Sequence, residues 1–380
     1  MTTSLFDLSP LLRLVGIGVV LAGLPLVWVL WRKRHAQGLG RLQALTLLTL
    51  FLTFDLVLFG SFTRLSDSGL GCPDWPGCYG SASPLGAQSQ ISDAQTAMPD
   101  GPVTHGKAWI EMVHRYLASS VGLLILALAL GAWWLWKNAN PKDKNKLLHP
   151  GWAALTFVWV CIQGAFGALT VTMKLFPAIV ALHLLGGYIL LALLSGQTVA
   201  LSLRERAEPA FAVPQRLRIG MALALLVLVL QVLSGAWVST NYAVLACTDF
   251  PLCQGQWWPQ MDFARGFEIW RPLGLSQDSS PLSFQALTAI HFFHRLLAAL
   301  TCVVVLVLYW QLRAYAVLRK PAHGLLVLLL LQVLTGLSNV VLGWPLLAAV
   351  LHTGGAGALG ACLVWLIVAS KAPPHFEKQQ

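Results

Sequence analysis

Nine continuous apolar runs, each about 20 residues long, constrain the fold of this chain more than any other feature of its sequence. A lipid bilayer offers no partners for backbone N–H and C=O groups, so only helices and closed β-barrels can span it. Barrel strands alternate apolar and polar residues, whereas these runs do not alternate. We therefore expect an all-α polytopic membrane protein with helices at about residues 10–31, 42–62, 112–136, 151–172, 177–202, 217–239, 288–312, 324–344 and 346–369.

Composition and charge agree with this prediction. Charged residues make up 11% of the chain, against roughly 25% in soluble proteins. A net charge of +10 would also suit a nucleic-acid partner, but the basic residues are divided unequally between the two sets of connections. Seventeen lie in one set: Arg32, Lys33, Arg34, Arg41, Lys137, Lys142, Lys144, Lys146, Arg204, Arg206, Arg216, Arg218, Arg313, Arg319, Lys320, Lys371 and Lys378. Five lie in the other: Arg64, Lys107, Lys174, Arg265 and Arg271.

The positive-inside rule places the basic-rich connections in the cytoplasm. The N-terminus and two long loops, at about 63–111 and 240–287, then face outward, and the C-terminus is cytoplasmic. We expect a multi-pass protein of the bacterial inner (plasma) membrane, with the lipid bilayer and not nucleic acid as its partner. Residues 81–107 lack periodicity and are expected to form a mobile flap over the outer face.

Five segments recur in the same order in the two halves of the chain. LFGSFTRLSDSGLG resembles VLSGAWVSTNYAVLA, and CPDWPGC resembles CTDFPLC. EMVHRYLA, QGAFGALTV and ALHLLGGY resemble HFFHRLLA, QVLTGLSNVV and VLHTGGAG. The repeats predict two tandem, parallel four-helix units, 42–203 and 204–370. Residues 1–41 would add one N-terminal transmembrane helix and a basic loop, and 371–380 a cytoplasmic tail.

Four histidines occupy equivalent positions in these repeats, at the outer ends of their helices. His114 and His183 belong to the first unit, and His294 and His352 to the second. A four-helix bundle with one inward histidine on each of two helices can ligate a heme iron through two imidazoles. Glycines after His183 and His352 would let a flat macrocycle approach the backbone. The alternative is that these are hydrogen-bonded membrane histidines, which is the better explanation for a single one but a poorer one for duplicated pairs.

Glu111 distinguishes the two units, because its repeat partner is His291. Glu111 and His114 are three residues apart and share a helix face. An acid beside only one pair suggests that the first unit carries out chemistry while the second carries electrons; the alternative is a solvated loop acid. Arg115 and Arg295 directly follow their histidines. Two interpretations are open: the guanidinium groups pair with heme propionates, or they reach the phosphate headgroups of the lipids.

The cysteines of the outer loops form two matched pairs, Cys72 with Cys78 and Cys247 with Cys253. Outside a bacterial cell, such pairs most simply indicate two disulfides. The spacing is unusual for zinc, and an exchangeable redox dithiol remains an alternative, above all for the first pair.

Together these motifs make the chain resemble the heme A synthase family. The resemblance covers about residues 45–370 and rests on TRLSDSGLGCPDWPGC, EMVHR, ALHLLGG, HFFHR and VLHTGG. It implies an oxidoreductase that converts the C8 methyl of heme O to a formyl group by successive hydroxylations, giving heme A. The first span departs from the family's usual eight helices.

The resemblance also implies roles for individual residues. His114 and His183 would bind the substrate heme, Glu111 would be the essential carboxylate, and His294 and His352 would ligate a heme b. Cys72 and Cys78 match the family's outer-loop pair. The implied partners are heme O synthase and oxidase assembly factors.

Two other function classes fit part of the pattern. A duplicated di-heme b-type cytochrome, linked to quinone, would explain the histidines but not the single acid. A transporter would place ionisable residues at mid-membrane, whereas here they cluster at one face of the membrane, which disfavours this class. The sequence leaves the oligomeric state open, a homo-oligomer included.

Overall fold

The computed structural model describes residues 9–142, 144 and 147–371. These residues contain nine helices that are long and apolar enough to cross a membrane, which confirms the predicted all-α polytopic membrane protein. Residues 1–8 and 372–380 of the two predicted terminal segments lie outside the described residues, as do Lys146 and Lys378 of the basic-rich connections. The nine helices are α1 (Ser9–Arg32), α2 (Gly38–Leu65), α4 (His105–Asn138), α5 (Gly151–Thr172), α6 (Pro177–Glu205), α7 (Gln215–Thr240), α9 (Phe284–Leu312), α10 (Arg319–Val341) and α11 (Leu346–Ala369).

Short elements occupy the connections. They are η1 (Pro84–Ala87), α3 (Gln88–Ala97), β1 (Phe211–Ala212), η3 (Ala243–Leu245), α8 (Phe263–Gly266), η4 (Ala316–Leu318) and β2 (Ser370–Lys371). β1 and β2 form a two-residue parallel pair that ties the α6–α7 connection to the end of α11.

The helices that carry the His-Arg pairs begin before their apolar runs do. α4 begins at His105 instead of about 112, and α9 at Phe284 instead of about 288. The side chain of Thr104 accepts the N–H of Lys107, and that of Ser283 accepts the N–H of Ala286. These N-caps satisfy backbone donors at the helix start, so capping and not hydrophobicity fixes where each helix begins.

Residues 81–107, expected to form a mobile flap, contain regular structure, and their mobility stays a prediction. The segment contains η1, α3 and the first residues of α4. Ile91 of α3 is fully buried and packs against Ala108 and Met112 of α4. One apolar residue on a short polar helix is too weak a periodic signal to be recognised in sequence, yet it is enough to hold that helix against α4.

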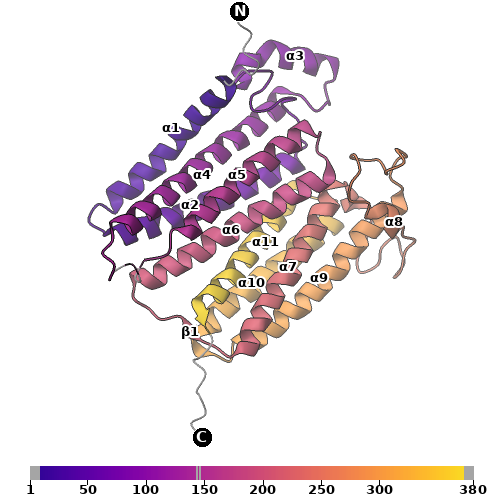
Figure 1. The fold of residues 1–380 in the computed structure, drawn as a ribbon. Helices are drawn as coiled ribbons and strands as arrows, with labels where there is room; N and C mark the ends of the chain where they lie inside the picture. The colour runs from indigo at the N-terminus through magenta and orange to yellow at the C-terminus, as the bar shows by residue number, and fades with distance from the viewer. Residues whose placement is uncertain (1–8, 143, 145–146, 372–380) are drawn as a thin grey trace, which may run out of the picture.

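The long helices pack side by side in two groups (Figure 1). In the first group, α2 and α5 each contact both α4 and α6; in the second, α7 and α10 each contact both α9 and α11. α6 and α11 pack together and join the groups. The division into units 42–203 and 204–370 and their origin by duplication stay predictions.

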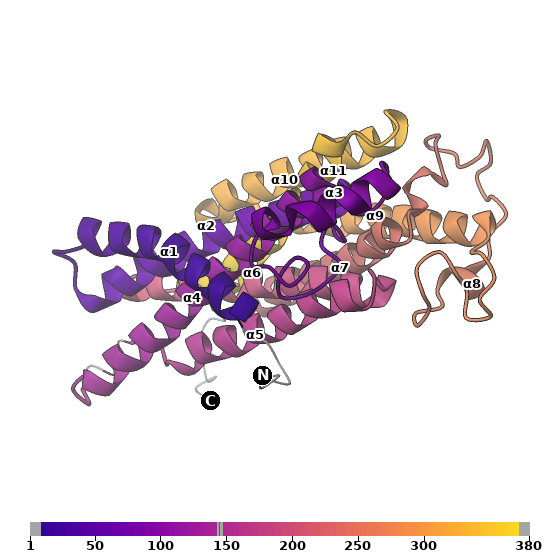
Figure 2. The same cartoon turned by 90° about the horizontal axis from the view of Figure 1, so that it is seen from above.

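α1 lies on the outer flank of the first group, against α4, and α8 lies on the opposite flank, as Figure 2 shows from above. The loops around α3 and α8 are at the same ends of the helices, away from β1 (Figure 1). The two loops therefore lie over the ends of α4 and α9 that carry the candidate site residues.

Candidate functional site

His114 of α4 and His183 of α6 belong to the same group of helices, and their rings lie within electrostatic range of each other. Each ring rests against a glycine of a neighbouring helix: a Cβ on Gly60 of α2 would lie 2.8 Å from Nε2 of His114, and one on Gly167 of α5 would lie 3.4 Å from Cε1 of His183. The ring of Phe59 also stacks on His114, with centroids 6.4 Å apart. The structure thus brings the two predicted residues of the first pair together.

His294 of α9 and His352 of α11 form the second pair, and their rings are likewise within electrostatic reach. A Cβ on Gly235 of α7 or Gly336 of α10 would lie 3.0 Å from Cε1 of His294 or His352, respectively. At Gly60, Gly235 and Gly336 an added Cβ would therefore crowd the imidazole, whereas at Gly167 it would be in ordinary van der Waals contact with His183.

Polar side chains orient the second pair. Ser234 lies 2.8 Å from Nδ1 of His294, and Thr335 lies 3.0 Å from Nδ1 of His352. Gln332 donates its amide to the backbone carbonyl of His352 at 2.9 Å. A hydrogen bond to Nδ1 sets the tautomer of the imidazole, and for His352 it leaves Nε2 for a ligand. At His294 the amide of Gln231 also lies 3.3 Å from Nε2, so a ligand at this nitrogen would have to replace that contact.

The two pairs are close to each other because α6 packs on α11. The hydroxyl of Tyr188, one turn beyond His183, donates to the carbonyl of Thr353 at 2.6 Å. A Cβ on Gly357 would lie 2.9 Å from the Tyr188 ring. Tyr188 thus bridges the helix of His183 and the helix of His352, a contact that the sequence did not suggest.

Glu111 is buried, with 4% of its surface exposed, which excludes the alternative of a solvated loop acid. Its Oε1 accepts a hydrogen bond from Nη2 of Arg115 at 2.5 Å, and its Oε2 accepts the backbone N–H of Cys72 at 2.8 Å. The carboxylate is therefore held between its own helix and the first disulfide loop, with lone pairs left on both oxygens.

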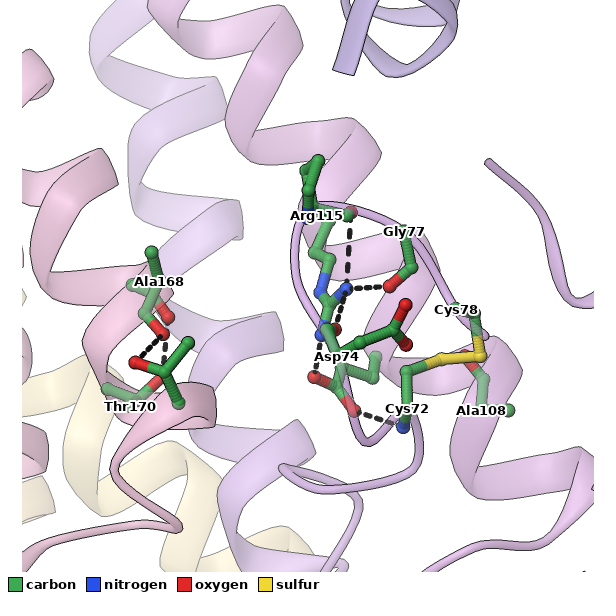
Figure 3. Close-up of polar contacts among 12 residues, drawn as sticks. Cys72, Asp74, Gly77, Cys78, Ala108, Arg115, Ala168 and Thr170 are labelled. Carbon is green, nitrogen blue, oxygen red and sulfur yellow. Dashed lines mark hydrogen bonds and ion pairs between the residues drawn. A yellow bond between two sulfur atoms is a disulfide. The ribbon is translucent and has the colours of Figure 1, made fainter. Parts of the chain in front are cut away.

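Arg115 is buried and connects Glu111 to that loop. Figure 3 shows Arg115 beside Asp74 and Gly77 of the loop. Nη1 donates to the carbonyls of Asp74 at 3.0 Å and Pro76 at 3.2 Å, and also to that of Gly77. Neither alternative from the sequence, a propionate or a phosphate headgroup, accounts for these contacts. Pairing with a propionate stays a prediction.

Arg295 plays the corresponding part at the second loop. It donates to the carbonyls of Asp249 at 2.9 Å, Leu252 at 2.8 Å and Cys247 at 2.9 Å. No acid takes the place of Glu111 here, because His291 stands at that position and is buried. The two loops are held in the same way, and only one of them is coupled to a carboxylate.

Both predicted cysteine pairs are disulfides, Cys72–Cys78 and Cys247–Cys253. Asp74 accepts the N–H groups of Tyr79 and Gly80 in the first loop, at 2.6 and 2.7 Å. Asp249 accepts those of Gln254 and Gly255 in the second, each at 2.8 Å.

The bond from Gly255, followed by the weaker effect of Gln254, holds the pKa of Asp249 below its ordinary value. The role of Asp74 and Asp249 in holding the backbone of the two loops was not predicted, although the aspartates recur at equivalent positions in CPDWPGC and CTDFPLC.

The residues of each pair fit a heme. A heme iron takes two axial ligands from the protein, which one pair of imidazoles supplies. Nδ1 of His183 is buried and has no hydrogen-bond partner within the described part of the chain. The residue opposite each histidine is a glycine, which brings no side chain of its own to the ring. The fit rests on the two imidazoles of each pair and on the small residues beside them.

Comparisons with known proteins show which family this chain is similar to. The model of the family COX15-CtaA, described as cytochrome oxidase assembly protein, matches residues 43–364. A protein named heme A synthase from Shewanella oneidensis is 40% identical over 320 residues, which cover 83% of this chain and 93% of the relative.

More distant relatives carry the same name. One from Halalkalibacterium halodurans is 28% identical over 82% of this chain and 91% of its own length. Another, from Symbiobacterium thermophilum, is 30% identical over 82% of this chain and 90% of its own length. The family match begins after α1, so this helix is additional to the matched region.

Proposed function

The chain belongs to the COX15-CtaA family of cytochrome oxidase assembly proteins, and we propose that it acts as a heme A synthase. In this proposal the C8 methyl of heme O is oxidised to a formyl group through successive hydroxylations. One observation carries it: a buried carboxylate, Glu111, stands beside one of two otherwise similar histidine pairs.

The first pair, His114 and His183, would hold the substrate heme O. The second, His294 and His352, would hold a heme b, which when bound supplies a one-electron redox centre. Because α6 packs on α11, the two pairs are near enough for electrons to pass between units. A di-heme cytochrome that only carried electrons would have no use for an acid at one histidine pair and a histidine at the other.

Glu111 would act on water. In this proposal the oxygen of the formyl group comes from water, so the conversion of the methyl group releases four electrons and four protons, and the electrons would leave one at a time through the heme b of the second unit to an external electron acceptor. Arg115 and the N–H of Cys72 fix the carboxylate in place, and a remaining lone pair can orient a water molecule or accept its proton. The negative charge would also stabilise positive charge that develops at the reacting carbon.

The replacement Glu111→Gln tests this role. The amide keeps the size of the side chain and can still accept the N–H of Cys72, so we expect heme binding to persist. We expect heme A yield to fall by about 100-fold or more, the usual contribution of a general base. Acid-acetone extraction and chromatography of hemes from protein coexpressed with a heme O source measures both.

The matched control is Glu268→Gln in the second outer loop, which should leave heme A yield unchanged. A normal yield from Glu111→Gln would remove the role assigned to this carboxylate. Heme b alone from the unmodified chain, at two per molecule, would instead favour the di-heme cytochrome.

A further inference from the structure

A cleft of about 580 Å³ lies on the face of the molecule that α1 covers, apart from the histidine pairs. One wall is α1, with Arg13, Ile17, Val20 and Leu21, and the other is the segment that follows the first disulfide, with Ser81 and Ser83. None of these residues belongs to the site described above.

Both walls are anchored to the rest of the protein. A Cβ on Gly18 of α1 would lie 2.9 Å from Cβ of Ser119 on α4, so the two helices are in close contact. Leu14 of α1 is buried in a cluster with Cys72 and Cys78. The cleft therefore has a fixed width and does not depend on a loop that closes over it.

The end of the cleft nearest the disulfide loop carries a positive charge that no residue in the described part of the chain compensates. Arg13 is exposed and makes no hydrogen bond or ion pair with the described residues. No acid lines the cleft. The hydroxyl of Ser81 makes only a weak contact, accepting the N–H of Ser83 at 3.4 Å, so its own O–H is available to donate. This end of the cleft suits an anion.

The other end of the cleft is apolar. Ile17, Val20 and Leu21 follow Arg13 by one to two turns toward the middle of the span, and Val20 is 67% exposed. Leu24 is 71% exposed and continues the same apolar surface beyond the cleft. From Arg13 to Leu24 the helix rises roughly 16 Å, about half the thickness of the hydrocarbon core.

We propose that this cleft binds an anionic phospholipid. The phosphate would pair with the guanidinium of Arg13 and accept the O–H of Ser81, and one acyl chain would lie along Ile17, Val20 and Leu21. A cation at the end of a span with an apolar track beneath it matches a lipid headgroup above its chain. A neutral amphiphile would leave the charge of Arg13 unpaired, which disfavours it.

The bound lipid would join α1 to the loop that positions Glu111. The backbone of Ser81 pairs with that of Cys78, through bonds of 2.7 and 3.0 Å. The carbonyl of Ala82 accepts the hydroxyl of Tyr116 on α4 at 2.7 Å. Since α1 lies outside the region matched by the family, this lipid contact is an addition specific to chains with such a helix.

Photo-crosslinking tests the proposal. The full-length protein is placed in phosphatidylcholine nanodiscs that contain a small fraction of phosphatidylglycerol with a diazirine in its acyl chain. After illumination, we expect labelled peptides from residues 17–24. Arg13→Gln should reduce this labelling about tenfold, the loss expected for one charge-assisted hydrogen bond.

Two further variants keep the test decisive. Gly16→Leu fills the cleft at a helix position with nothing within 4 Å, so it should block labelling without harming the fold. Arg265→Gln, an exposed arginine of the second outer loop, should have no effect. Equal labelling of other lipid-facing helices, insensitivity to both cleft variants, or equal labelling by a phosphatidylcholine probe would overturn the proposal. Binding of inorganic phosphate to the cleft, without any labelling by the acyl-chain probe, would overturn it in favour of a free-anion site.

Discussion

Arg115 and Arg295 show how equivalent residues acquire unequal importance. Both bind three backbone carbonyls of a disulfide loop, but only Arg115 also binds a carboxylate, that of Glu111. Sequence alone suggested a propionate or a headgroup for each arginine. The loop carbonyls were missed because they are brought to the arginines by long-range folding, which leaves no local signal.

Replacement of each arginine by glutamine should separate the two roles. Arg115→Gln leaves Glu111 buried without its ion-pair partner, at a cost of about 3–5 kcal/mol. Arg295→Gln removes only hydrogen bonds to carbonyls, at about 1–3 kcal/mol. We expect the larger fall in thermal stability, together with loss of heme A, from the first variant. Equal shifts in melting temperature would show that the Glu111–Arg115 pair adds nothing to the fold of the first loop.

At the scale of helices, the glycines opposite the histidines decide how closely neighbouring helices approach. The sequence predicted the four histidines and their helices, because long apolar runs and repeated motifs carry that information. It did not predict which glycine faces which histidine, since this depends on helix rotation. Gly60, Gly167, Gly235 and Gly336 recur at equivalent repeat positions, and that recurrence was the available signal.

Alanine at these glycines should weaken heme binding one unit at a time. Gly60→Ala places a methyl 2.8 Å from Nε2 of His114, and Gly235→Ala places one 3.0 Å from Cε1 of His294. Such overpacking costs about 1–3 kcal/mol, so the imidazole must move. We expect Gly60→Ala to lower heme A yield and Gly235→Ala to lower heme b content, as measured by heme extraction and pyridine hemochrome spectra.

Gly164→Ala provides the matched control for these variants. It lies on α5, and nothing is within 4 Å of the added Cβ, so alanine should be neutral or stabilise the helix by up to about 1 kcal/mol. If the three variants behaved alike, close contact at the histidines would not be the cause of heme loss.

For the whole molecule, contacts between distant segments were the part that sequence reasoning could not reach. The length of the continuous apolar runs identified all nine spans, and repeats paired the cysteines correctly. The position of α1 on α4 followed from neither, because a helix without a repeat partner has no template. The contact of Arg64 was not predicted either: its Nη2 donates from the first group of helices to the carbonyl of Ser239 in the second, at 2.8 Å.

The orientation of the molecule is a prediction that rests on charge alone. Disulfides form in an oxidising compartment, so it matters which side of the membrane the two cysteine loops face. The test uses a background in which Cys161, Cys302 and Cys362 are replaced by serine, with one new cysteine added.

Gln277→Cys lies in the second outer loop and Asn140→Cys in the basic-rich α4–α5 connection, and both positions are exposed. We expect a membrane-impermeant maleimide to label Gln277→Cys on intact cells and Asn140→Cys only after permeabilisation, because the basic-rich connections are retained in the cytoplasm. The background without an added cysteine should stay unlabelled. The reverse pattern would place both histidine pairs near the cytoplasmic face, and the disulfides would then need an explanation other than an oxidising compartment.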